Sequence, residues 1–240
     1  MDMIVISEGW FWMGSNGHYR WESPRHRVWL DGFAIAKTAV TRREYAVFLS
    51  QTGHGEPVGW NEPAFMHLDQ PVVGVTWFAA VAYCEWLSKL HGETYRLPTE
   101  AEWEKACRGG IEDAEYAWGN EPPSSFEYFR GEWKGPRPVG QWRPNGYGLW
   151  NIGDNVHEWC ADWYAGDYYP HSPVQNPAGP ETGTRRVSRG GSWRHQIKAS
   201  RAAHRSSLPP GFGYTDYGFR LVKGVAGNPI GKHEQSEAPR

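Results

Sequence analysis

Apolar residues spaced three and four positions apart predict three helices in the first half of the chain. The first begins at a Thr-Arg-Arg-Glu capping box, residues 41–44, and ends at Gly53. The second runs from Thr76 to Gly92. The third begins at another capping box, residues 99–102, and ends at Gly109. Each segment has a threonine where a helix begins and a glycine where it ends, which favours short helices with defined ends.

Shorter apolar runs predict β-strands at residues 10–13, 28–35, 187–193 and 217–223. In the last run, Phe219 and Leu221 are expected on one face and Arg220 and Val222 on the other, because side chains alternate along a strand. Residues 110–184 carry almost no periodic pattern and are rich in Gly, Pro, Asn, Trp and Tyr. A loop region of this length in a compact domain is usually functional or held by a ligand.

The composition agrees with a domain built largely from ordered loops. Of the 240 residues, 29 are Gly and 18 are Pro, and aromatic residues make up 15%, with 15 Trp. Gly and Pro favour turns, and large aromatic side chains, each burying on the order of 150–250 Å², fix such loops to a core. We therefore predict one α+β domain with little regular secondary structure and aromatic-rich loops.

The charge balance excludes several classes of function. Lys and Arg number 25 against 27 Asp and Glu, a formal net charge of −2, which gives no long-range attraction to nucleic acid or anionic lipid. No apolar stretch approaches the roughly 18 residues of a membrane span, and the first residues lack the regions of a signal peptide. The sequence predicts no nucleic-acid partner, no membrane and a cytoplasmic location, and it leaves the oligomeric state open.

Five segments, in this order and spacing, resemble one protein family. They are Phe-Trp-Met-Gly-Ser at 11–15, Arg-Leu-Pro-Thr-Glu-Ala-Glu-Trp-Glu at 96–104, Asn-Gly-Tyr-Gly-Leu-Trp-Asn at 145–151 followed by Asn-Val-His-Glu-Trp at 155–159, Arg-Gly-Gly-Ser-Trp at 189–193, and Tyr-Gly-Phe-Arg at 217–220. Together they are similar to the formylglycine-generating enzymes, or sulfatase-modifying factors. The resemblance implies a C-type-lectin-like fold for residues 1–223, and the polar residues 224–240 are expected to form a flexible tail.

The resemblance implies a copper-dependent oxidase, which converts a sulfatase cysteine to formylglycine with dioxygen. Its copper is held by two cysteine thiolates after the Arg-Gly-Gly-Ser motif, and thiolates are soft ligands that suit Cu(I). Residues 193–201 contain no cysteine, and Cys84, Cys107 and Cys160 all lie earlier. Copper is therefore not expected, and neither is the conversion of cysteine to formylglycine. The three cysteines are predicted to be buried apolar residues.

Histidines offer a different set of metal ligands. His195 and His204 lie in or just after the segment that would carry the thiolates, and His157 lies in the other motif-bearing loop. Two of these imidazoles with Asp216 would make a two-histidine, one-carboxylate site for iron or another transition metal. The alternative is that the histidines are surface or hydrogen-bonding groups in a groove.

By resemblance, residues 151–158 match a structural calcium loop of the family. The ligands carried over are the Asn151 side chain, the backbone carbonyls of Gly153, Asp154 and Val156, and the Glu158 carboxylate. Such a mixture of carbonyl and carboxylate oxygens suits Ca²⁺. Asp154 stands where the family usually has glycine, and His157 where it often has tryptophan. The alternative is that the polar residues only brace the loop by hydrogen bonds.

The resemblance places the substrate groove beside Ser192, Trp193 and Arg220. Around these positions the sequence adds His195, Arg201, His204, Arg205, Tyr214 and Tyr217. The catalytic candidates are Ser192, His195 and His204. Arginines and aromatic residues suit a peptide or an acidic small molecule as the ligand. The alternatives are a structural salt bridge for Arg220, a core position for Trp193 and a solvated basic face for residues 194–205.

Three functions stay open on the sequence alone. The chain is an oxidoreductase or maturation enzyme that acts without copper on a peptide or small molecule, a non-catalytic lectin-like binding module, or a modulator of a related oxidase. The fold does not choose among them, because one scaffold hosts many functions.

Overall fold

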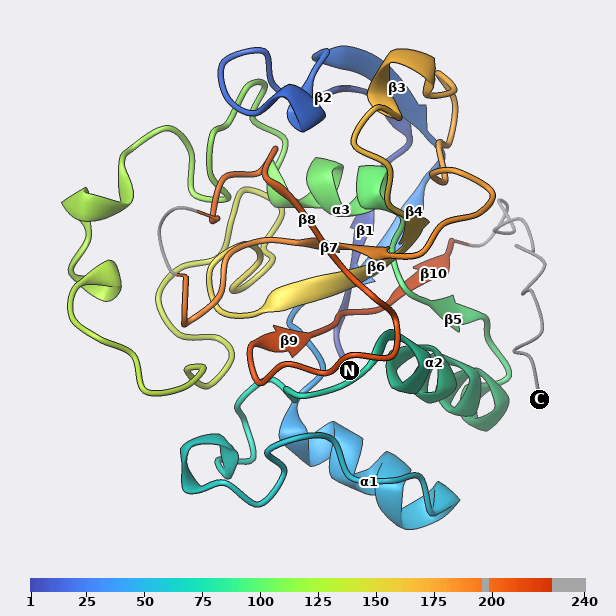
Figure 1. Cartoon of the computed structure of the whole chain (residues 1–240), viewed down its shortest axis with the longest axis vertical. Helices are drawn as coiled ribbons and strands as arrows, with labels where there is room; N and C mark the ends of the chain where they lie inside the picture. The colour runs from blue at the N-terminus through green and yellow to red at the C-terminus, as the bar shows by residue number, and fades with distance from the viewer. Residues whose placement is uncertain (196–198, 226–240) are drawn as a thin grey trace.

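The computed structural model describes residues 1–195 and 199–225 (Figure 1). Residues 226–240, which make up most of the predicted tail, and residues 196–198 lie outside the described residues. The three predicted helices are confirmed as α1 (Arg42–Thr52), α2 (Trp77–His91) and α3 (Glu100–Cys107). Among the described residues, none of the helices has the length and apolarity that crossing a lipid bilayer requires.

The helix ends form close to where the sequence predicts them. Each helix begins after its predicted threonine, whose hydroxyl accepts a hydrogen bond from the backbone N–H three residues later. Gly53 and Gly92, which end α1 and α2, both adopt a φ of 68°, a left-handed conformation that glycine reaches without a steric penalty. The last residue of α3 is Cys107 and its C-cap is Arg108, one residue before the predicted Gly109.

Short strands form three sheets within the described residues. The first has the order β1 (Met3–Ile6), β4 (Phe33–Ala36), β10 (Val222–Gly224) and β5 (Tyr95–Arg96), the second pairs β2 (Gly9–Met13) with β3 (His26–Leu30), and the third has the order β8 (Arg205–Leu208), β7 (Arg186–Arg189), β6 (His157–Trp163) and β9 (Tyr217–Gly218). All pairs are antiparallel except β6 with β9, which is parallel. Single 3-10 turns in the loops are η1 (Arg20–Glu22), η2 (Pro63–Phe65), η3 (Pro123–Ser125), η4 (Glu127–Phe129) and η5 (Tyr169–His171).

Two of the predicted strands are divided in the structure. Residues 28–35 fall in β3 and β4, which belong to different sheets, with Asp31 and Gly32 between them. Residues 217–223 fall in β9 and β10, which also belong to different sheets. The expected alternation of side chains does not separate a buried face from an exposed one there, because all four residues from Phe219 to Val222 are fully buried.

Other strands differ from the prediction in length or were not predicted. The strand expected at residues 187–193 ends at Arg189, because Gly190 turns the chain with a φ of +81°. Strands β1, β5, β6 and β8 had no separate prediction. Strand β6 lies inside the long region predicted as loop, and its first four residues are all buried. It therefore lacks the polar–apolar alternation by which a half-buried strand is recognised.

Strand β6 lies between two apolar cores. Cys160 on one face packs in a cluster with Trp103 of α3, whereas Trp159 on the other face packs in a cluster with Tyr45 of α1 and Tyr83 of α2. In Figure 1, α3 accordingly lies on one side of the sheet that contains β6, and α1 and α2 lie on the other. Successive residues of one strand thus hold both halves of the molecule together.

Aromatic side chains fix the long loop region, as its composition predicts. Trp118 lies against Phe129 with ring centroids 4.7 Å apart, and Trp142 lies against Phe126 at 5.2 Å. Tyr128 stacks on Trp142 with centroids 4.9 Å apart and an interplanar angle of 8°. Such pairs contribute about 0.5–1.5 kcal/mol each beyond the area they bury. The loop is therefore ordered by ring packing rather than by regular secondary structure.

A buried ion pair connects β6 to the segment between β9 and β10. Arg220 donates to both oxygens of Glu158, from Nε at 2.6 Å and from Nη2 at 2.7 Å. Trp103 of α3 donates to the same carboxylate from its indole nitrogen at 2.7 Å. All three side chains are fully buried. Removal of one partner from such a pair leaves an uncompensated charge in the core.

Arg220→Met is expected to lower the free energy of unfolding by about 3–5 kcal/mol, because Glu158 would stay buried without its cation. Urea denaturation followed by tryptophan fluorescence measures this loss. The matched control is Arg43→Met, which removes an exposed pair with Asp69 at 3.0 Å and is expected to cost less than about 1 kcal/mol. Equal losses in the two variants would contradict the structural role of Arg220.

Candidate functional site

The parallel pairing of β6 with β9 brings two candidate residues together. His157, the first residue of β6, lies opposite Tyr217 in β9. The backbone N–H of His157 donates to the carbonyl of Asp216 at 2.9 Å. His157 and Asp216 are 4% and 2% exposed. An imidazole and a carboxylate from distant parts of the sequence therefore share one buried edge of the sheet.

The segment after β7 supplies a third residue, His195. This segment is fastened to the loop before β6 by two backbone hydrogen bonds of 2.8 Å, from Gly191 to the Gly153 carbonyl and from Trp193 to the Asn155 carbonyl. His195 lies two residues after Trp193 and is exposed. The Arg-Gly-Gly-Ser-Trp motif thus serves to dock His195 beside β6.

His157, His195 and Asp216 form what we call the His–Asp cluster. Each offers one ligand atom, and these atoms all lie within 4.8 Å of one another. Asp216 Oδ2 is 3.9 Å from His157 Nε2 and 3.7 Å from His195 Nε2. Neighbouring ligands that bind a metal at about 2.1 Å lie about 3 Å apart. The side chain of His195 is 62% exposed, so it has room to approach Asp216 more closely, whereas the separation of Asp216 and His157 is set by two buried residues.

His157 is held in a state that suits a metal ligand. Its Nδ1 lies 2.6 Å from the Gly190 carbonyl. A carbonyl only accepts, so Nδ1 carries the hydrogen and Nε2 keeps its lone pair. Burial lowers the pKa of His157 to about 4, which leaves the ring neutral at pH 7. Metals bind neutral imidazole, and a carbonyl on the far nitrogen fixes the ring orientation.

Asp216 is shared by two further side chains. Ser192 donates from Oγ to Asp216 Oδ2 at 2.9 Å, and Arg194 Nη1 lies 3.9 Å from Oδ1. Ser192 is fully buried, so its hydroxyl positions the carboxylate instead of facing a groove. Arg194 is half exposed and was not predicted as a groove residue, since nothing in the sequence distinguishes it from the other arginines nearby.

His204 is not part of the His–Asp cluster. Its ring lies edge-on to Tyr19 with centroids 6.0 Å apart. Burial lowers the pKa of His204 to about 3, and its buried Nδ1 has no hydrogen-bond partner within residues 1–195 and 199–225. Of the three histidines considered from the sequence, the structure therefore brings together His157 and His195.

The aromatic groove candidates differ in exposure. Tyr217 is buried, with its ring 4.9 Å from that of His157. Tyr214 is 47% exposed. Trp193 is partly buried beside a small apolar core, and its indole donates to the Thr215 carbonyl at 3.0 Å. Tyr214 is the member of this set with the most surface available to a ligand.

The structure corrects the placement of three arginines in the groove. Each is buried and forms two hydrogen bonds with the carboxylate of one glutamate. The pairs are Arg201–Glu22, Arg205–Glu100 and Arg220–Glu158. The neighbouring sequence of Arg201 and Arg205 contains no acid, so it suggested a solvated basic face. Their partners come from distant segments that only the fold brings close.

Most of the predicted calcium ligands already have partners. Asn151 Oδ1 accepts a backbone N–H at 3.0 Å, the Gly153 carbonyl accepts another at 2.8 Å, and both oxygens of Glu158 accept from an arginine. The Val156 side chain packs in a small apolar core. Burial raises the pKa of Asp154 to about 7. These contacts agree with the alternative that the loop is braced by hydrogen bonds. None of them tests calcium itself, which stays a prediction.

The cysteines do not fit a copper site. Cys84 in α2, Cys107 in α3 and Cys160 in β6 are buried free thiols, as the sequence predicts. Burial raises the pKa of each thiol above its ordinary value. A Cu(I) site of the formylglycine-generating kind needs two neighbouring thiolates, whereas burial favours the neutral thiol at all three positions. That the chain holds no copper stays a prediction.

Comparisons with known proteins agree with this architecture. The family model described as sulfatase-modifying factor enzyme 1-like domain matches residues 1–225. The chain is 36% identical to the formylglycine-generating enzyme of Streptomyces coelicolor over 260 residues, which cover 84% of this chain and 81% of that enzyme. It is 35% identical over 244 residues to the serine/threonine-protein kinase pkn1 of Chlamydia caviae.

The match to the kinase covers 93% of this chain and 38% of the kinase, so the chain spans well under half the length of that relative. Among solved structures, Treponema denticola variable protein 1 superposes with a TM-score of 0.80 at 27% identity, over 92% of this chain and 94% of that one. The predicted fold is therefore confirmed as the C-type-lectin-like α+β fold of these proteins. The chain belongs to the sulfatase-modifying factor family, whose members include the formylglycine-generating enzymes.

Proposed function

We propose that this protein binds a divalent transition metal, Fe(II) in the simplest case, at the His–Asp cluster and oxidises a peptide or small molecule with dioxygen. The observation that carries the proposal is that the ligand atoms of His157, His195 and Asp216 lie within 4.8 Å of one another. Two imidazoles and one carboxylate are the donor set of non-haem iron oxygenases, which leave metal positions open for substrate and dioxygen.

A row of aromatic rings supports access from the surface to the cluster. Phe212 and Tyr214 are 53% and 47% exposed, with ring centroids 6.3 Å apart. Tyr214 lies 6.1 Å from Tyr217, which in turn lies 4.9 Å from His157. These rings, together with the half-exposed guanidinium of Arg194, which lies 3.9 Å from the other oxygen of Asp216, suit a peptide or an acidic small molecule.

A non-catalytic binding module is the second candidate, and one observation favours it. His157 and Asp216 are both almost fully buried, so His195 is the exposed member of the cluster. A ligand could then be recognised by His195, Arg194 and Tyr214 without any chemistry. Metal binding together with metal-dependent oxygen consumption would separate the enzyme from the binding module and from a modulator of a related oxidase.

His195→Ala is expected to weaken metal binding at least tenfold, because it removes one of three protein ligands. Anaerobic titration with Co(II), followed by its visible absorption, measures the affinity and reports the coordination geometry. The matched control is His54→Ala, an exposed histidine outside the cluster, which is expected to bind as the wild type does. Equal affinities for all three proteins would remove the proposed metal site.

A sulfatase-type cysteine peptide incubated with the protein, copper and a reductant is expected to yield no aldehyde. The reason is that residues 193–201, where the resemblance places the two thiolates that hold Cu(I), contain no cysteine. Mass spectrometry of the peptide detects formylglycine directly. Formylglycine produced over several turnovers would show that this chain does have formylglycine-generating activity.

Calcium at residues 151–158 is tested by chelation. If the loop holds the ion, removal with EGTA lowers the melting temperature, since a ligand that binds only the folded state stabilises that state. Readdition of Ca²⁺, with Mg²⁺ as the control, then restores it. An unchanged melting temperature would assign Asn151 and Glu158 to bracing the loop alone.

A further inference from the structure

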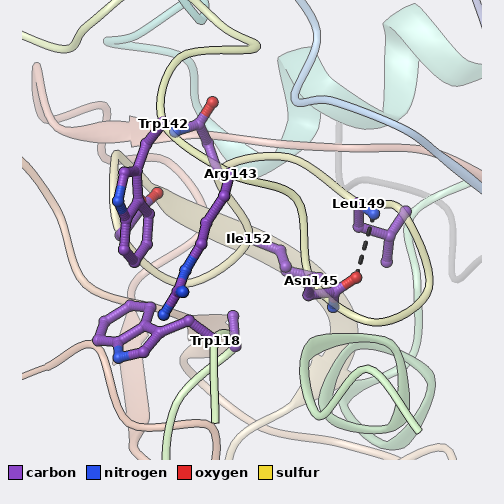
Figure 2. A pocket seen from close by; sticks show the side chains of 9 residues that line it. Trp118, Trp142, Arg143, Asn145, Leu149 and Ile152 are labelled. Carbon is purple, nitrogen blue, oxygen red and sulfur yellow. Dashed lines mark hydrogen bonds between the residues drawn. The ribbon is translucent and has the colours of Figure 1, made fainter. Parts of the chain in front are cut away.

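A small cavity lies in the aromatic loop region and shares no residue with the His–Asp cluster. Its volume is about 10 Å³, which holds one water-sized occupant. Trp118 and Trp142 line it together with Arg143, Asn151 and Asp154. Figure 2 shows the Arg143 side chain extending past Trp142 toward Trp118. The cavity therefore combines aromatic walls with one carboxylate and one guanidinium.

The carboxylate of Asp154 has one oxygen without a partner. The residue is 2% exposed, and hydrogen bonds to its carboxyl come from Asn151 and Tyr128. Within the part of the chain that the structure describes, Oδ1 is buried and accepts no hydrogen bond. Buried polar groups are nearly always paired, because an unpaired one costs free energy. The oxygen therefore points to an occupant that donates hydrogen bonds or carries positive charge.

The walls of the cavity are held in a strained conformation. Trp142 has a φ of +76°, in a region that bulky residues rarely adopt. Its ring stacks on Tyr128 and lies 5.1 Å from Trp118 at an interplanar angle of 72°. Asn151, which donates to the carbonyl of Gln141 beside Trp142, also has a positive φ, of 52°, although asparagine adopts this region more readily than tryptophan does. Such strain persists where the surroundings impose it, and it concentrates at ligand sites.

Arg143 already places a cation against these rings. Its guanidinium lies 5.0 Å from the centroid of Trp142 and 4.6 Å from that of Phe126. The side chain is 42% exposed, and its acidic partner Glu121, at 3.4 Å, is 65% exposed. An exposed pair of this kind contributes little stability. Arg143 can therefore leave the rings at low cost and give way to another cation.

We infer that this cavity is a subsite for a primary ammonium group, carried by a lysine side chain or another amine-bearing ligand. Three N–H donors on a compact head let the ammonium bond to Asp154 Oδ1 while it faces the rings of Trp118 and Trp142. Calcium is a poorer match for this cavity, since it needs six to eight oxygens. Asn151 Oδ1 is already committed to a backbone N–H.

Binding of methylammonium chloride tests the inference, with tetramethylammonium chloride and sodium chloride as controls at equal ionic strength. Tetramethylammonium has the charge but neither the N–H donors nor the small size. The readouts are melting temperature and tryptophan fluorescence as functions of concentration. We expect a saturable response to methylammonium that exceeds both controls.

Two variants with a matched control locate the response. Asp154→Asn is expected to weaken methylammonium binding at least tenfold, because the amide that replaces the carboxyl offers an ammonium group no anionic acceptor. Arg143→Gln is expected to strengthen it at least threefold, because it removes the competing cation. Arg130→Gln, which removes an exposed charge from the same loop region, is expected to leave the affinity unchanged.

The inference is overturned if methylammonium gives no more response than sodium in both the wild type and Arg143→Gln. It is equally overturned if folded Asp154→Asn binds as tightly as the wild type. Should Asp154→Asn fail to fold, Arg143→Gln decides alone, because the substituted side chain is at the surface. If the affinity of Arg143→Gln for methylammonium is then no higher than that of the wild type, the proposed subsite is contradicted.

Discussion

The buried pairing of Glu158 with Arg220 is the interaction on which the rest of this structure depends. Arg220 follows β9 and precedes β10, and Glu158 is the second residue of β6, so the pair fixes the end of the domain to its central strand. Trp103 brings α3 to the same carboxylate. Because the charge of each partner is desolvated, neither side chain is free to serve elsewhere. Structural ion pairs of this kind recur through the core, at Arg189, Arg201 and Arg205.

This arrangement determines which polar residues remain for chemistry. The alternation of β6 directs Glu158 into the core beside α3, and its neighbour His157 lies at the start of the strand next to Asp216. The arginines that look suited to a substrate are used to neutralise buried glutamates. What remains at the edge of the sheet is an imidazole pair with one carboxylate. Of these three residues, His195 lies in residues 193–201, the segment where the resemblance places the family's thiolates.

The sequence was most informative where local chemistry dictates the conformation. N-terminal threonines, two of them in capping boxes, and the glycines near the C-terminal ends located the three helices, because these signals depend on residues within one turn of each other. The resemblance of the motifs supplied the fold, which periodicity alone did not. Strand β6 was not predicted, because its first residues are buried on both faces of the strand. Residues 217–223 were predicted as one strand but form β9 and β10, which belong to two different sheets. For the site, His157, His195 and Asp216 were recognised as candidates, but the exclusion of His204 and the burial of Arg201 depend on contacts between remote segments.

The hydrogen bond from Ser192 to Asp216 has a consequence for how the molecule would respond to an ion. The acceptor oxygen, Oδ2, is the same atom that faces both imidazoles. A cation drawn to that oxygen competes with the Ser192 hydroxyl for the oxygen's lone pairs. Ser192 belongs to the same segment, residues 190–195, as His195. Binding of a cation at the His–Asp cluster would therefore change the conformation of residues 190–195. A spectroscopic probe attached near this loop at the protein surface would detect that change.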